Sequence, residues 1–156
     1  MLKWSGQAVE DALAEVGGCG YLARTLEEWR THPQERAVAP LALLDIEAAG
    51  DDGPMRSFAP GGTMPLSGLR VLDMSRVIAG PVAARVLAAY GADVIRVGAP
   101  HLPEMATVFI DTGFGKRSVH LDLRTSADRA RFEALAATVD VMIQAYRPGV
   151  LDALGY

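Results

Sequence analysis

The chain has 156 residues, half of them hydrophobic, which suffices for one domain with a buried core, or for one domain and a piece of another. A net charge of -4 argues against a nucleic-acid partner, and no apolar run approaches the ~20 residues that a membrane helix needs. Because Cys19 is the single cysteine, no internal disulfide can form, and we expect a reducing, cytoplasmic setting. The three histidines lie far apart in the sequence, so we expect no metal site.

The first helices of the chain are predicted by their capping residues. Ser5 can cap a helix that ends at the glycine pair of residues 17–18. Thr25 and Glu28 are three residues apart, which is the pattern of a capping box at the start of a second, short helix. We therefore predict two helices before residue 33.

Two short apolar runs near the N-terminus have the length of strands. They are residues 21–23 and 41–46. With the two helices, they predict a small α/β segment over residues 1–49. Glycine, proline and aspartate then gather without apolar periodicity, and this composition predicts a linker over residues 50–64.

Strands and helices alternate in the remaining sequence. We predict strands at residues 69–72, 94–97, 118–123 and 140–144. Thr125 or Ser126 caps a helix between the last two strands, and a short helical turn follows Pro148 and Gly149. This alternation is typical of an α/β fold with a parallel sheet.

The helix between the first two strands has its own start and stop signals. Pro81 suits the first helical position, and Gly91 suits the position just after the helix. The apolar side chains predicted on its inner face are those of Val82, Val86, Leu87 and Tyr90.

Three arginines follow strand ends in this arrangement. Arg76, Arg124 and Arg147 come after the first, third and fourth predicted strands, and ligands of parallel sheets bind at that edge. Guanidinium groups bind phosphates, and the backbone amides of Ala79 and Gly80 lie near a helix N-terminus. Taken singly, each arginine is better explained as a solvated side chain or as a cap on a neighbouring carbonyl, but the shared edge of all three favours an anion site.

Two familiar phosphate motifs are absent. A dinucleotide site requires G-x-G-x-x-G after its first strand, where this chain reads MSRVIAG (residues 74–80). The run GFGKRS (residues 113–118) resembles a P-loop, but Ile110 replaces its first glycine and a strand follows instead of a helix. Neither class of nucleotide site is predicted.

Four ordered runs resemble family III CoA-transferases, a family that includes formyl-CoA and carnitine-CoA transferases and is related to the 2-methylacyl-CoA racemases. The runs are PLSGLRVLDMSRVIAGP (65–81), GADVIRV (91–97), GKRSVHLDL (115–123) and YRPGVL (146–151). The resemblance implies a Rossmann-like parallel half-sheet that binds CoA, incomplete over residues 65–156, and interlocked homodimers. It also implies acyl-CoA and a carboxylic acid as substrates, with no covalently bound cofactor.

The same resemblance implies which residues contact CoA. They come from three loops at the carboxyl ends of strands, largely those that carry the arginines. The implied contacts are Arg76, Val77, Ile78 and Ala79, then Leu121 and Arg124, then Ala145, Tyr146 and Val150.

The chain also departs from the family's pattern. Ile78 stands where formyl-CoA transferases have glutamine, and Gly98 stands where many members have an acidic residue. The family's catalytic aspartate, which forms an acyl anhydride, corresponds to a position beyond Tyr156, so no catalytic residue is assigned. Three alternatives stay open: a racemase-type enzyme, a non-catalytic CoA-binding module that needs a partner chain, and an unrelated nucleotide-binding domain.

The N-terminal segment resembles a later part of the same family. Residues 24–29, 32–34 and 41–46 are similar to its small domain, which follows the start of the large domain in single-copy members. The reversed order predicts a fused tandem of family units, with this chain at the junction. A sheet that ends at its fourth strand also predicts pairing with a copy of the chain or with a partner chain.

Overall fold

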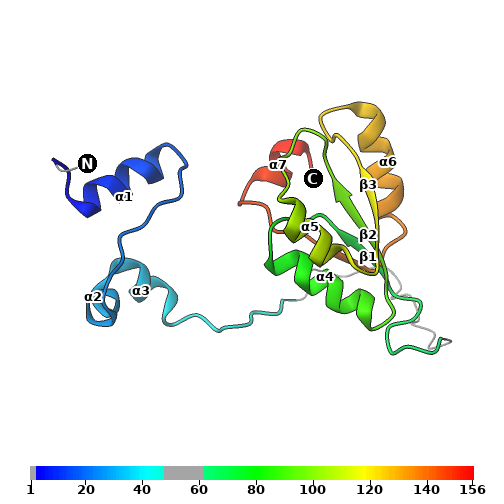
Figure 1. Ribbon diagram of the computed structural model, residues 1–156, viewed down its shortest axis with the longest axis horizontal. Coiled ribbons are helices and arrows are strands. Elements are labelled where there is room, and N and C mark those ends of the chain that lie inside the picture. Colours follow the sequence, from blue (N-terminus) through cyan, green and yellow to red (C-terminus); the bar gives the residue numbers. More distant parts are fainter. Residues whose placement is uncertain (1–2, 48–61) are drawn as a thin grey trace. The chain divides into compact units, whose positions relative to one another are not determined.

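The computed structural model describes residues 3–47 and 62–156 (Figure 1). The chain separates into two compact units, Met1–Asp52 and Gly53–Tyr156. Most of the linker predicted at residues 50–64 lies outside the described residues, so its boundaries stay a prediction. In the parts that the structure does describe, no helix combines the length and the apolar composition needed to cross a bilayer.

The first unit contains three short helices with side-chain caps. They are α1 (Gly6–Glu15), α2 (Leu26–Thr31) and α3 (Pro33–Val38). Ser5 Oγ accepts a hydrogen bond from the amide of Ala8 at 3.1 Å. Thr25 and Glu28 form both hydrogen bonds of a capping box. The two predicted helices and their caps are confirmed.

The strands predicted in this unit are wrong. Residues 21–23 and 41–46 have no regular secondary structure, and Leu43 and Ile46 are 99% and 91% exposed. A strand is stable only with a neighbouring strand that pairs with its backbone. Residues 3–47 contain no such strand. The first unit, as far as it is described, is therefore helical rather than α/β.

The second unit is built on a parallel sheet, as predicted. Its strands are β1 (Arg70–Asp73), β2 (Asp93–Gly98), β3 (Lys116–His120) and β4 (Val141–Ile143), in the order β3-β2-β1-β4. Its helices are α4 (Ala79–Ala89), α5 (Ala106–Gly113), α6 (Ser126–Ala136) and α7 (Val150–Leu154). Thr125 caps α6 by accepting the amide of Asp128 at 3.2 Å.

Helices cover both faces of the sheet. Consecutive residues of a strand point to opposite faces. Val71 packs in one buried cluster with Ala84 of α4, whereas Leu72 packs in another with Phe132 of α6 and side chains of α7. The sheet therefore has a core on each side, which is the doubly wound arrangement.

Helix α4 differs from its prediction in start and in orientation. It begins at Ala79, so Pro81 is its third residue. Its buried residues are Pro81 and Ala84, whereas Val82, Val86 and Tyr90 are 40%, 47% and 52% exposed. A small side chain such as alanine lets a helix lie close to the sheet, and this close packing outweighs the size of the apolar residues. Gly91, with φ +98°, ends the helix as predicted.

Strand β3 lies earlier in the chain than predicted, and helix α5 was not predicted. The register pairs Val94 with Lys116 and Gly98 with His120. Leu121 and Leu123, which suggested a strand to residue 123, are buried in the core just after the strand. Helix α5 lacks a side-chain cap and is rich in β-branched residues, so the sequence carried little helical signal there.

Candidate functional site

The strand order reverses between β1 and β4. The chain leaves β1 toward α4 on one face of the sheet and leaves β4 toward α7 on the other. In sheets of this kind, the crevice between two such diverging loops is where ligands bind. The loop of residues 74–78 and that of residues 144–149 are therefore the first place to look for a site.

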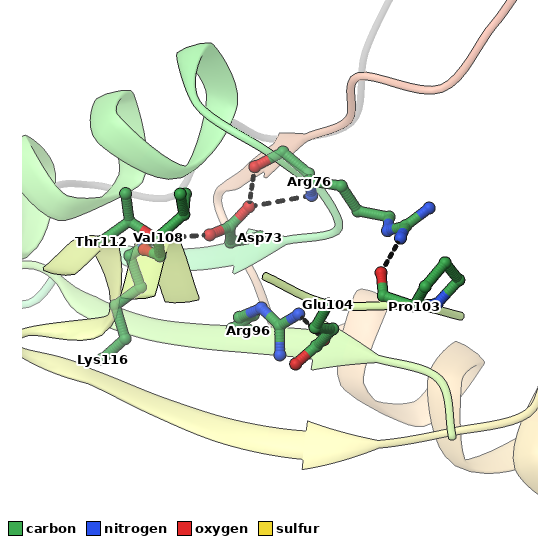
Figure 2. A network of polar contacts seen from close by, with 9 residues as sticks. Asp73, Arg76, Arg96, Pro103, Glu104, Val108, Thr112 and Lys116 are labelled. Atoms are coloured by element: carbon green, nitrogen blue, oxygen red, sulfur yellow. Dashed lines mark hydrogen bonds and ion pairs between the residues drawn. The ribbon is translucent and has the colours of Figure 1, made fainter. Parts of the chain in front are cut away.

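The loop after β1 is held by a buried polar network. The fully buried Asp73 accepts hydrogen bonds from the amide of Ser75 at 2.9 Å and from the hydroxyl of the same residue. Lys116 Nζ donates to Asp73 at 2.8 Å (Figure 2). It also donates to the carbonyl oxygen of Pro81 at 2.8 Å. Lys116 thus joins β3, β1 and α4, and its charge is balanced within the fold instead of facing a ligand.

The same loop contains an unusual backbone conformation. Val77 has φ +69°, in the left-handed region that β-branched residues seldom adopt. Such a conformation costs on the order of 1–3 kcal/mol and is concentrated at functional sites. Val77 and Ile78 are each 60% exposed, so their side chains face outward from the loop.

A pocket of about 410 Å³ lies at the carboxyl ends of β2 and β3. Five residues predicted to contact CoA line it: Arg76, Leu121, Arg124, Tyr146 and Val150. Residues that the sequence did not single out complete its wall, among them Met74, Ala99, His101, Leu102 and Ala153. Its lining is mostly apolar with a few convergent polar groups, which is typical of small-molecule sites.

The charged groups at this pocket are partly engaged with one another. Arg124 binds Asp122 through two hydrogen bonds, of 2.8 and 2.7 Å, and its side chain is 61% exposed. These bonds hold the pKa of Asp122 well below its usual range and raise that of Arg124. His101 Nδ1 lies 3.8 Å from Asp122. Arg76 donates to the carbonyl oxygen of Pro103.

Tyr146 connects this pocket to the loop after β1. Burial raises the pKa of its phenol, and the nearby charges of Arg76 and Arg96 act in the opposite direction. Tyr146 also packs against the core cluster that contains Leu72. Its ring is therefore a rigid wall of the pocket within the electrostatic range of two arginines.

The remaining predicted residues lie outside this pocket. Val77 lines a second pocket, next to the first, while Ile78, Ala79 and Ala145 are exposed near it. Arg147 is also exposed and does not line the pocket, so the structure brings two of the three predicted arginines to it. Within the described part of the chain, no group of three or more His, Cys, Asp or Glu side chains is placed to hold a metal ion.

The second pocket consists largely of residues that sequence reasoning missed. Arg96, Glu104, Val108, Phe109 and Thr112 line it. Arg96 lies inside a predicted strand, where a charged side chain is expected to face solvent. Val108, Phe109 and Thr112 belong to helix α5, which was not predicted. The usable signal was the loop after β2, since such loops reach the ligand edge.

These features define a doubly wound α/β domain with a small-molecule site at the carboxyl edge of its sheet. The chain belongs to CoA-transferase family III, whose family model matches residues 66–156. This match confirms the resemblance seen in the four sequence runs, and it covers the whole of the sheet.

Relatives with known names agree with this assignment. A probable fatty acyl-CoA transferase of Mycobacterium tuberculosis, Rv3272, is 40% identical over 104 residues, which are 58% of this chain and 26% of the relative. Its crystal structure superposes with a TM-score of 0.54, covering 59% of this chain and 28% of that one. The formyl-CoA:oxalate CoA-transferase of Rhodopseudomonas palustris is 34% identical over 106 residues, or 60% of this chain and 25% of its own length.

Matches that cover nearly the whole chain also occur. The alpha subunit of the succinyl-CoA–L-malate CoA-transferase of Chloroflexus aurantiacus is 28% identical over 169 residues, covering 99% of this chain and 34% of the relative. The chain thus spans about a quarter to a third of the length of these three relatives.

Proposed function

We propose that this chain supplies the CoA-binding part of an enzyme that moves CoA between carboxylic acids. The observation that carries the proposal is the pocket of about 410 Å³, lined by Arg76, Arg124 and Tyr146, in a domain of this family. The arginines offer donors for the phosphates of CoA, and the apolar wall suits its pantetheine arm. For Arg124 to bind phosphate, its exposed pair with Asp122 has to open, which costs little because such pairs are weak.

The chemistry follows from the family resemblance. A carboxylate attacks the thioester carbon and releases the CoA thiolate, which then attacks the enzyme's own carbonyl in the resulting anhydride, expels the donor acid and leaves an enzyme–CoA thioester. The acceptor carboxylate attacks this thioester and releases the thiolate again. The thiolate attacks the acceptor's carbonyl in the new anhydride, which yields the new acyl-CoA and frees the enzyme carboxylate. We assign the attacking aspartate to a position outside residues 1–156. The transferase names of the relatives favour this reaction over the racemase alternative.

The aspartates near the pocket are unsuited to this attack. Asp73 is fully buried and accepts hydrogen bonds from Ser75 and Lys116. Asp122 accepts the backbone amide of Arg124 at 3.1 Å, so it is held as a capping residue even when the arginine side chain turns to a ligand. We therefore expect no acyl transfer by the chain alone, and a copy of the chain or a partner chain to complete the site. Mass spectrometry after incubation with acyl-CoA tests this, and an acyl adduct on either aspartate would contradict it.

Calorimetric titration with CoA, ATP and NAD tests the binding function. We expect CoA to bind most tightly, and equal or tighter binding of ATP would refute the proposal. Arg124→Ala should weaken CoA binding by about 1–3 kcal/mol, the range for a charge-assisted hydrogen bond, without lowering the melting temperature. Arg131→Ala is the matched control, because Arg131 is an exposed arginine of α6 that pairs with Asp128 away from the pocket.

A further inference from the structure

The second pocket, of about 290 Å³, lies between the loop after β1, the end of β2 and helix α5. Its wall is mostly apolar, with Val108 and Phe109 of α5 among its residues. The hydroxyl of Thr112 donates to the carbonyl oxygen of Val108 at 2.8 Å, and that of Ser75 donates to Asp73. The polar groups that remain for a ligand are those of Arg76, Arg96 and Glu104.

Arg96 is the unusual residue of this pocket. It is 7% exposed, its guanidinium carbon lies 4.6 Å from the ring centre of Phe109, and its Nη2 pairs with Glu104. Its other terminal nitrogen, Nη1, is buried, and no acceptor among the described residues reaches it (Figure 2). A buried N–H of a charged group without an acceptor is costly and rare in native proteins. Nη1 is therefore a donor without an acceptor, and a ligand reaches it only when a neighbouring side chain moves.

Gly98 explains why the chain itself does not satisfy this nitrogen. Residues two apart in a strand share a face, so Gly98 stands beside Arg96 on β2. A Cβ atom placed on Gly98 would lie 2.9 Å from Arg96 Nη1 and 3.2 Å from Glu104 Oε1. An acidic residue at position 98 could pair with Arg96, but glycine leaves that place without a carboxylate.

Glu104 is the movable member of the arrangement. Its side chain is 27% exposed on the loop that precedes α5, whereas Arg96 is held on a strand that pairs on both sides. A ligand carboxylate can reach Nη1 when Glu104 rotates aside. Two arginines and one glutamate line the pocket, so the local charge favours an anion.

We propose that the second pocket binds the free carboxylate of an acyl group, so that the preferred thioester is one of a short dicarboxylic acid. This inference rests on the proposed CoA-binding function. Arg76 lines both pockets, which lets a ligand run from one to the other with its thioester in the larger pocket. A carboxylate that is paired with a buried guanidinium is a poor nucleophile. It therefore serves for recognition, and CoA is attached to a second carboxyl group of the same acid.

Succinyl-CoA and butyryl-CoA provide the test, because both acyl groups have four carbons and only the first has a free carboxylate. We expect the chain to bind succinyl-CoA about tenfold or more tightly than butyryl-CoA, the effect of one charge-assisted hydrogen bond. Arg96→Gln should abolish this preference and leave the affinity for CoA itself unchanged. Equal affinities in the native chain, or a preference that survives Arg96→Gln, would overturn the inference.

Position 98 offers a second pair of variants that does not depend on removing a buried arginine. Gly98→Asp places a carboxylate beside Nη1 and should remove the preference for succinyl-CoA, whereas Gly98→Ala adds the same Cβ without the carboxylate and should keep it. A preference that both variants keep, or that both lose while CoA still binds, would count against Arg96 as the anchor.

Failure of the proposed CoA-binding function can be separated from failure of this inference. If neither CoA nor the two thioesters bind, titration with free butyrate and with the uncharged butyramide still examines the second pocket alone. Tighter binding of butyrate that depends on Arg96 would support the carboxylate site without CoA. Equal binding of the acid and the amide would remove it.

Discussion

The two units of the chain differ in what stabilises their elements. In residues 3–47 every helix has a side-chain cap, yet none of the described residues is buried. In residues 62–156, Val71 and Leu72 are fully buried on opposite faces of one sheet. Capping is a local interaction that specifies where a helix begins, whereas a core requires residues far apart in sequence to meet. The comparison teaches that helix boundaries and stability have separate sources.

The largest effect should come from the buried ion pair of the sheet unit. Lys116→Met leaves Asp73 as a buried charge without its partner, which costs about 3–5 kcal/mol. Arg117→Met is the control, because its pair with Asp93 is 64% and 45% exposed and contributes about 0–1 kcal/mol. Urea unfolding measured by circular dichroism compares them. Similar losses in both variants would show that burial does not set the strength of the pair.

A leucine exchanged in each unit tests the comparison directly. Leu72→Ala removes a fully buried side chain from the core and should destabilise the sheet unit by about 2–5 kcal/mol. Leu43→Ala removes a side chain that is 99% exposed and should change stability by no more than about 0.5 kcal/mol. Thermal unfolding of the two variants gives the result. A large loss for Leu43→Ala would mean that the first unit buries this leucine after all.

Equivalent caps in the two units should differ in how far their effects spread. Thr25→Ala removes the capping box of α2, and Thr125→Ala removes the cap of α6, each at a cost of about 0.5–2 kcal/mol. Because α6 packs on the core through Phe132, we expect Thr125→Ala to lower the stability of the whole sheet unit. Thr25→Ala should raise amide exchange only within α2. Hydrogen exchange followed by NMR distinguishes a local from a global change.

The smallest effect should be the loss of the Thr25–Glu28 hydrogen bond at acidic pH. The amide of Thr25 donates to Glu28 at 2.7 Å, and this bond lowers the pKa of Glu28 below its ordinary value of 4.5. Because the folded-state pKa is the lower one, the stabilisation is complete above pH 4.5 and is lost as the pH falls through the lowered value. The Thr25 amide resonance should therefore shift in acid in the native chain and stay constant in Glu28→Gln. A shift that persists in the variant would assign it to another group.

Local signals in the sequence predicted much of the second unit. Strand β1 lies within one residue of its predicted range, and α6 is capped at Thr125, one of the two residues that the pattern offered. The errors occurred where long-range packing decides. Helix α4 turns Ala84 toward the sheet instead of Val82, and strand β3 begins at Lys116 because its register follows β2. Neither outcome is encoded within a few neighbouring residues.

The sequence likewise predicted one part of the candidate site and missed another. Arg76, Arg124 and Tyr146 follow strand ends, so the parallel topology alone places them near one edge. The bond between Arg124 and Asp122 joins residues two apart, but the sequence did not show that it would occupy the arginine. The second pocket depends on α5, a helix without a capping signal, and it was missed for that reason.

The sequence by itself determined the family, the alternation of strands and helices, and the helix caps, because these depend on motifs and on neighbouring residues. Only the tertiary structure decided that Lys116 is the buried partner of Asp73, 43 residues away. It also decided that Arg96 is enclosed by Phe109 and Glu104, and that its Nη1 has no hydrogen-bond acceptor. Burial and pairing of charges depend on which distant residues the fold brings together, and no local pattern records that.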